Sequence, residues 1–218
     1  MATSMTTSTL TLPAPAKLNL FLHINEQRED GYHELQTLFQ FIDRCDALHF
    51  TAISEDAIQI SPAIPGVKTK DNLIHKAATL LIPFKKVNTG IQIKLDKVLP
   101  MGGGIGGGSS DAATTLVALN QLWLCGLNTQ QLSEIGLKLG ADVPVFVQGH
   151  AAWAEGVGEK LTPAHPTEPW YVVLTPACHV NTGEIFSHQG LTRDTPKLRI
   201  ALALEGDVKN YQNDCEKI

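Results

Sequence analysis

The amino-acid sequence predicts a mixed α+β fold, and three observations support this class. Stretches with the two-residue alternation of strands and stretches with helical periodicity both occur, but they do not alternate regularly as the βαβ units of a doubly wound sheet would. The 218 residues, 43% of them hydrophobic and 18% charged, suffice to bury a sizeable core. The composition shifts toward proline beyond Gly158, which predicts one domain over residues 1–157 and a second over 158–218.

In the first half of the chain, we expect mainly strands. Residues 1–13 carry no charged side chain and are expected to form a disordered tail. Apolar residues alternate along residues 16–24, which is the pattern of a half-buried strand on which Lys17 and Asn19 share a face. A turn is predicted around Gly31. Later in this half, one helix is predicted to begin after its cap at Asp71 or Asn72 and to run to residue 81. Further strands are predicted over residues 35–42, 47–53, 58–61 and 90–95.

The second half of the chain combines helices with strands. A helix capped by Ser110 or Asp111 is expected to end near Gly126, and Asn128 opens another helix that Gly140 ends. Strands are predicted over residues 143–148 and 150–155, joined at Gly149, and over residues 170–174.

Charge and cysteine content exclude several classes of protein. The net charge is −5 without any basic block, so nucleic acid is a poor candidate partner. No apolar run approaches the roughly 20 residues of a membrane-spanning helix. The four cysteines are scattered, which favours a reducing cytoplasm, and the eight histidines form no metal-binding motif. We therefore expect a cytoplasmic monomer or weak homodimer without a structural metal.

The segment 101–110, MGGGIGGGSS, contains six glycines and two serines and lies between a predicted strand and a predicted helix. Unpaired N–H groups at a helix start bind anions, and glycines let the backbone approach a phosphate closely. Gly102, Gly104 and Gly107 match the dinucleotide pattern G-x-G-x-x-G, but residues 121–131 lack the acidic residue that should follow. The G-K-[S/T] of a Walker loop and the H-R-D and D-F-G motifs of protein kinases are absent. A phosphate-binding loop and a flexible connector both remain possible from the residues alone.

The sequence contains four motifs in order: P-A-K-L-N-L-F-L (15–22), D-G-Y-H-E-L-Q-T-L-F-Q (30–40), L-P-M-G-G-G-I-G-G-G-S-S-D-A-A (99–113) and G-A-D-V-P-V-F (140–146). Together they resemble the GHMP kinase superfamily. The resemblance implies a two-domain α+β architecture, with an N-terminal ATP-binding domain and a C-terminal substrate domain. Members carry a further glycine-rich motif near their C-terminus; none follows Asp214, so we expect the second domain to be incomplete here.

The stretch 17–40 is the more specific part of this resemblance. It implies ATP-dependent phosphorylation of the 2-hydroxyl of a methylerythritol unit linked to cytidine diphosphate, a step toward isoprenoid precursors. Two alternatives stay open. One is a GHMP kinase for another small alcohol, such as homoserine, mevalonate or a sugar, and the other is an inactive nucleotide-binding fragment.

The resemblance also implies roles for particular residues. Asp142 is the expected catalytic base, and Lys17 is the cation expected to keep it ionised and to stabilise charge during transfer. Asn72 and Lys97 are expected near the adenine of ATP. Without the resemblance, Asp142 is an ordinary turn residue and Asn72 a plain helix cap. The loop residues expected around the phosphates and Mg²⁺ are Pro100, Met101, Gly102, Gly103, Gly104, Ile105, Gly106, Gly107, Gly108, Ser109 and Ser110.

The acceptor is expected to be bound by residues of both domains. Asn19 lies beside Lys17 on the first predicted strand, and Tyr32 and His33 follow the turn at Gly31. The resemblance places Tyr32 against the cytosine ring in a stack shared with Phe186, while His33 hydrogen-bonds the edge of the base. No protein ligands of the metal are predicted.

Overall fold

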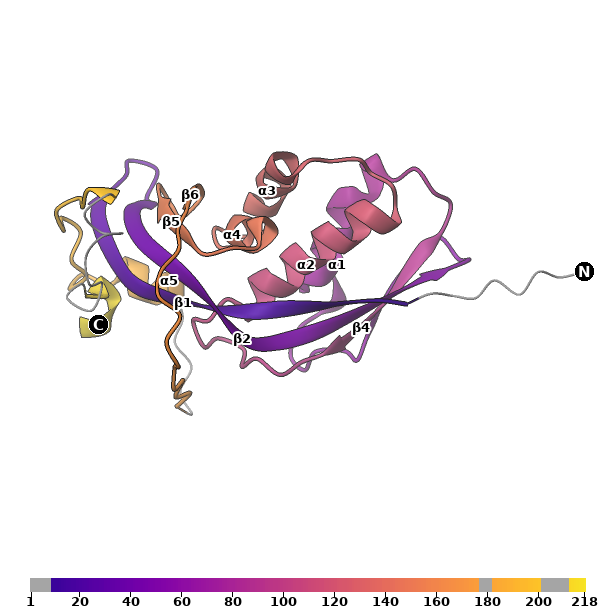
Figure 1. The fold of residues 1–218 in the computed structure, drawn as a ribbon, viewed down its shortest axis with the longest axis horizontal. Coiled ribbons are helices and arrows are strands. Elements are labelled where there is room, and N and C mark those ends of the chain that lie inside the picture. Colours follow the sequence, from indigo (N-terminus) through magenta and orange to yellow (C-terminus); the bar gives the residue numbers. More distant parts are fainter. Residues whose placement is uncertain (1–8, 177–181, 201–211) are drawn as a thin grey trace, which may run out of the picture.

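One mixed sheet organises the part of the chain that the computed structural model describes, residues 9–176, 182–200 and 212–218. Its two longest strands, β1 (Thr9–Gln27) and β2 (His33–Ile53), pair antiparallel along almost their whole length (Figure 1). The other edge of β2 pairs with β4 (Gly90–Asp96) through its second half and with β5 (Ala152–Glu155) through its first half. The short strands β3 (Ile58–Ser61) and β6 (Lys160–Pro163) complete the sheet beside β4 and β5 respectively.

Helices cover one face of this sheet (Figure 1). They are α1 (Leu73–Leu81), flanked by the 3₁₀ turns η1 (Thr69–Asp71) and η2 (Ile82–Phe84), then α2 (Gly107–Leu122), α3 (Thr129–Leu137) and α4 (Val143–Gln148). The paired strands β1 and β2 form a long ribbon, and a turn joins them at one end, between Gln27 and His33. Two short elements lie near that end, α5 (Thr182–Ser187) and η4 (Asp214–Lys217). Among the described residues, every helix falls short of the length and apolar character needed to cross a bilayer.

The core lies between the sheet and these helices. Buried side chains of β2 and β4, such as Phe50 and Ile93, pack against Leu116 and Leu119 of α2 in one large cluster. Phe21, Leu38 and Trp153 form a smaller cluster at the other end of β1 and β2. The ribbon therefore links two separate apolar cores.

Most predicted strands and helices are confirmed, with changes at their ends. The strands predicted over 35–42 and 47–53 are one strand, β2, although the exposed residues Asp43 and Arg44 interrupt its apolar alternation. Residues 9–13, expected in the disordered tail, begin β1 and pair with β2. Residues 1–8 lie outside the described part. The expected domain boundary falls in the turn between β5 and β6, which pair with each other.

The strand predicted over residues 143–148 is wrong, because this segment forms helix α4. Pro144 occupies the first turn, where its missing N–H costs nothing and its fixed φ suits a helix. Val143, Val145, Phe146 and Val147 are all buried, so packing outweighs their preference for strands. The strand predicted over 170–174 is also wrong, since these residues have no regular structure.

The start of α2 also differs from its prediction. The helix begins at Gly107 behind Gly106, which has a φ of +76° and makes no side-chain cap. Ser110 and Asp111, predicted as caps, lie inside the helix and are buried. The helix can begin this early because the left-handed conformation of Gly106 turns the backbone into the helical direction at Gly107. By contrast, Asn72 and Asn128 cap α1 and α3 as predicted.

Candidate active site

A cleft of about 800 Å³ opens along the glycine loop. The loop lines it from Pro100 to Ser109. Residues of β1, β2, α1, the turn before α4, α5 and the C-terminal segment contribute other parts of the wall. Residues predicted for catalysis, nucleotide binding and acceptor binding therefore meet in one cavity. Those that line it besides the loop are Lys17, Asn19, Asn72, Lys97, Asp142 and Phe186.

Lys17 is the centre of the polar contacts in this cleft. Only 5% of it is exposed, and its Nζ lies 3.3 Å from Oδ2 of Asp142. The same ammonium donates to Oδ1 of Asn19 at 2.6 Å and to the carbonyl of Gly104 at 3.1 Å. Strand β1, the glycine loop and the turn before α4 are thus joined by one cation, next to a carboxylate whose side chain is 35% exposed.

The geometry of β1 explains why Lys17 reaches the loop. Residues two apart on a strand share a face, which puts Lys17 and Asn19 side by side as the sequence predicts. The backbone N–H of Lys17 also donates to the carbonyl of Ile105 at 2.9 Å. Asn19 is oriented in turn, because its Nδ2 donates to the hydroxyl of Thr37 on β2 at 2.8 Å.

The glycine loop has a backbone that side chains would obstruct. Gly102, Gly104 and Gly106 have φ values of +72°, +68° and +76°, in the left-handed region. A Cβ on Gly106 would also lie 2.7 Å from Cζ of Phe146, so this position requires glycine for space as well. Helix α2 then starts with N–H groups that no side chain caps, which is the arrangement that binds anions. Ser109 lines the cleft, whereas Ser110 is buried and does not.

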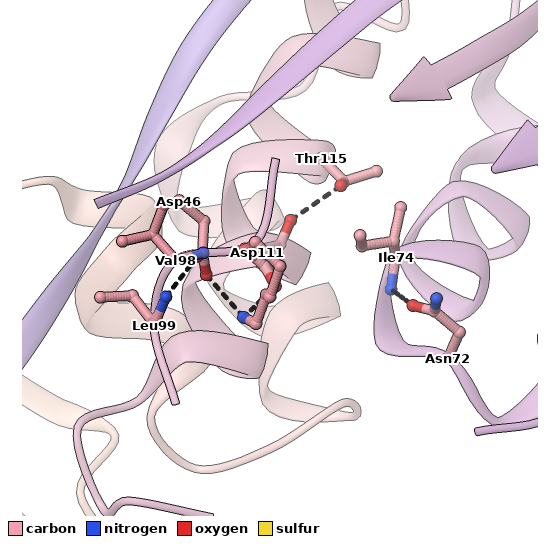
Figure 2. A network of polar contacts seen from close by, with 8 residues as sticks. Asp46, Asn72, Ile74, Val98, Leu99, Asp111 and Thr115 are labelled. Carbon is pink, nitrogen blue, oxygen red and sulfur yellow. Dashed lines mark hydrogen bonds and ion pairs between the residues drawn. The ribbon is translucent and has the colours of Figure 1, made fainter. Parts of the chain in front are cut away.

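A charged cluster that the sequence did not predict, Asp46, Lys97 and Asp111, adjoins the glycine loop (Figure 2). Nζ of Lys97 lies 2.5 Å from Oδ2 of Asp46 and 2.8 Å from Oδ2 of Asp111. The other oxygen of Asp46 accepts the backbone N–H groups of Val98 and Leu99, at 2.5 and 2.7 Å. Asp46 thus fixes the entry into the glycine loop, and Lys97 fastens that entry to the first turns of α2.

Burial and ion pairing act in opposite directions on the pKa values of this cluster. Burial raises the pKa of Asp111 to about 7, against the opposing attraction of Lys97. Burial lowers the pKa of Lys97, but its attraction to Asp111 and Asp46 outweighs this and leaves the pKa above its usual value. Lys97 therefore stays a cation at the edge of the cleft.

Asn72 has a structural role that is plain in the structure. Its Oδ1 accepts the N–H of Ile74 at 2.9 Å and caps α1 (Figure 2). It is 8% exposed and also lines the cleft, so its contact with a nucleotide stays a prediction.

Tyr32 and His33, both predicted to bind the cytidyl group, differ in their exposure to solvent. Tyr32 is 65% exposed and does not line the cleft. His33 is buried, and it is this ring that contacts Phe186, with centroids 5.4 Å apart. Arg193, which the sequence did not single out, donates from Nε to Nε2 of His33 at 3.0 Å. In the described part of the chain, no three His, Cys, Asp or Glu side chains gather into a metal-binding group.

Comparison with known proteins first defines the class, the GHMP kinases, which are small-molecule phosphotransferases. The model of the GHMP kinases N terminal domain matches residues 72–150. The fold is shared with the solved structure of homoserine kinase from Cytophaga hutchinsonii, at 14% identity and a TM-score of 0.59 over 93% of this chain and 65% of that one. It is also shared with the Methanococcus jannaschii mevalonate kinase, at 14% identity and a TM-score of 0.54 over 73% of this chain and 56% of that one.

Relatives with higher identity narrow the assignment. The 4-diphosphocytidyl-2-C-methyl-D-erythritol kinase of Marinobacter nauticus is 60% identical over 212 residues, 96% of this chain and 74% of that protein. The same kinase of Tolumonas auensis is 59% identical over 206 residues, 94% of this chain and 71% of that protein. A crystal structure of 4-(cytidine 5'-diphospho)-2C-methyl-D-erythritol kinase matches at 33% identity with a TM-score of 0.76, covering 95% of this chain and 76% of that one. The chain belongs to the 4-diphosphocytidyl-2-C-methyl-D-erythritol kinase family.

Proposed function

We propose that this protein transfers the γ-phosphoryl group of ATP to the 2-hydroxyl of 4-diphosphocytidyl-2-C-methyl-D-erythritol in the cytoplasm. The observation that carries the proposal is the Lys17–Asp142 ion pair, which lies in the same cleft as the glycine loop. The relatives named for this reaction supply the acceptor.

Phosphoryl transfer requires positioning and charge stabilisation more than covalent chemistry from the protein. Pro100 to Ser109 surround the phosphates, with the uncapped start of α2 facing their negative charge. Lys97 and Asn72 line the nucleotide side of the cleft. The acceptor occupies the side of Asn19 and Phe186, so the two substrates meet at Lys17 and Asp142.

Asp142 orients the acceptor hydroxyl and takes its proton as the oxygen bonds to the γ-phosphorus. The bond between that phosphorus and the β–γ bridging oxygen breaks, and ADP leaves with the bonding electrons. Lys17, held by Asn19 and the Gly104 carbonyl, keeps Asp142 in place and balances the charge that develops.

The cleft fits a magnesium ion that the nucleotide carries. Mg²⁺ keeps several waters and uses one or two carboxylates besides phosphate oxygens. Of the carboxylates that line the cleft, that of Asp71 would be available to the ion, because Asp142 serves the acceptor hydroxyl and Asp111 pairs with Lys97. When bound, the ion would offset the negative charge of the phosphates.

An ATP-consumption assay across acceptors tests the proposal. We expect turnover with the cytidyl compound and none with mevalonate or homoserine, and the reverse result would overturn the assignment. ATP binding without turnover on any acceptor would favour an inactive nucleotide-binding fragment.

The assignment of Asp142 has its own experiment. Asp142→Asn should lower turnover by about 10²–10⁴-fold, the usual contribution of a general base, with little change in substrate binding. Asp43→Asn, at an exposed carboxylate of β2, serves as the matched control. Turnover of Asp142→Asn close to that of the control would remove Asp142 from the mechanism.

A further inference from the structure

One arginine, Arg193, connects His33 to the segment that carries Phe186. Nε of Arg193 donates to Nε2 of His33 at 3.0 Å, across 160 residues of sequence. Its Nη1 donates to the carbonyl of Leu191 at 3.1 Å, and its Nη2 to the carbonyls of Phe186 and His188 at 3.0 and 2.9 Å. The guanidinium thus fixes His33 of β2 and the turn after α5 in one arrangement.

This contact decides which nitrogen of His33 carries the proton. An arginine side chain remains protonated and can only donate, so Nε2 of His33 must accept. Burial lowers the pKa of His33, and the positive charge of Arg193 lowers it further. The ring is therefore neutral near pH 7, with its proton on Nδ1. Within the described residues, the structure shows no hydrogen bond to that Nδ1.

We propose that Arg193 is a positioning residue that makes the substrate site selective for cytosine, by fixing His33 as a donor through Nδ1 and by holding Phe186 beside it. The inference rests on the proposed function, because the acceptor supplies the base. Phe186 lines the cleft and its ring lies 5.4 Å from that of His33, which connects the imidazole to the cavity.

The chemistry of the two pyrimidines makes this arrangement discriminating. N3 of cytosine accepts a hydrogen bond, whereas N3 of uracil carries a hydrogen and donates. A histidine that is free to change tautomer can match either base through the same nitrogen. A histidine held with its proton on Nδ1 pairs with cytosine and opposes uracil, and a site that leaves polar groups unpaired rejects the wrong ligand strongly.

Two measurements on the chain test the inference. Long-range ¹⁵N–¹H correlation spectra of the histidine-labelled protein report the tautomer of His33. Titrations with CDP, UDP and ADP report selectivity for the base. We expect Nδ1–H in the unmodified chain, together with tighter binding of CDP than of UDP. In Arg193→Leu, we expect a shift toward Nε2–H and a loss of about tenfold or more in the CDP-to-UDP ratio, with ADP affinity unchanged.

Two further variants separate positioning from folding. Arg193→Lys retains one donor and should restore the tautomer and part of the selectivity. Arg199→Leu, at an exposed arginine nearby, should leave both readouts unchanged. The inference is overturned if His33 carries its proton on Nε2 in the unmodified chain, or if Arg193→Leu keeps the CDP-to-UDP ratio. A failure of the proposed function can be distinguished from a failure of this inference. In that case the chain would still bind CDP more tightly than UDP but would not phosphorylate the cytidyl compound.

Discussion

Two lysines of the cleft stand in opposite electrostatic settings, and each setting suits a different task. Lys17 contacts one carboxylate, Asp142, and two neutral oxygens, so its cluster has no net charge when both groups are ionised. Lys97 lies between two buried carboxylates, Asp46 and Asp111, and its cluster carries one negative charge when all three are ionised. Lys17 is placed to act on reacting groups, and Lys97 is placed to hold the loop.

Lys17→Met tests this division at the lysine that we propose to be catalytic. Turnover should fall by about 10²–10³-fold, because a preorganised charge at the transferring group is lost. The stability loss should stay within about 1–3 kcal/mol, because Asn19 and Gly104 lose a buried donor while water can solvate Asp142. Turnover at saturating substrates and urea unfolding measure the two effects. A large loss of stability with little loss of turnover would assign Lys17 a structural role instead.

Asp111 should give the folding free energy an unusual dependence on pH. Its pKa is about 7 in the folded chain, against 3.8 for an unperturbed aspartate. Between these values the folded state binds more protons than the unfolded state, so this group reduces stability as pH rises from about 4 to 7. Urea unfolding at pH 5 and pH 8 should show a smaller decline for Asp111→Asn than for the unmodified chain. Equal declines in both would contradict the assignment.

At the scale of the elements, the sequence predicts those features that depend on contacts between residues close together in the chain. Asn72 and Asn128 were identified as caps because their side chains bond to the helix that follows within a few residues. Helix α4 is predicted as a strand because valine prefers strands, whereas its burial against α2 and α3 favours the helix and leaves no local signal in the sequence. The Lys17–Asn19 pair followed from strand geometry, but the Asp46–Lys97–Asp111 cluster depends on how β2, β4 and α2 pack. Spacings of 51 and 14 residues carry no signal for such a contact.

The glycine loop allows backbone strain to be separated from crowding. Gly104 and Gly106 both have left-handed φ values, but a Cβ on Gly104 meets nothing within 4 Å, while one on Gly106 meets Phe146. Gly104→Ala should cost about 1–2 kcal/mol of stability from conformation alone. Gly106→Ala should cost clearly more and should also weaken ATP binding, since Phe146 or the loop must move. Chemical unfolding of both variants measures the difference, and equal costs would show that crowding plays no part.

Across the whole molecule, the paired strands β1 and β2 form one continuous element that runs from the large core to the C-terminal segments (Figure 1). Buried polar groups fasten the C-terminal segments to the far end of this ribbon. Oδ2 of Asp214 accepts the N–H of Ile24 at 2.7 Å and the hydroxyl of Thr195 at 2.8 Å. Gln36 donates to and accepts from the backbone of Leu198. These contacts fix the segment that carries Arg193, so they support the proposed acceptor site.

Asp214→Ala should therefore weaken the acceptor site while the nucleotide site is retained. Removing the carboxylate leaves the N–H of Ile24 without its acceptor, which costs about 1–3 kcal/mol and loosens the segment around Thr195. Hydrogen exchange should speed up at Ile24 and stay slow at Ile93, which lies in the large core near the nucleotide. The KM for the cytidyl substrate should rise about tenfold with the KM for ATP nearly unchanged. Asp194→Ala, at an exposed neighbouring carboxylate, should leave both constants unchanged. A parallel rise in both constants would mean that the ribbon transmits the disturbance along its whole length.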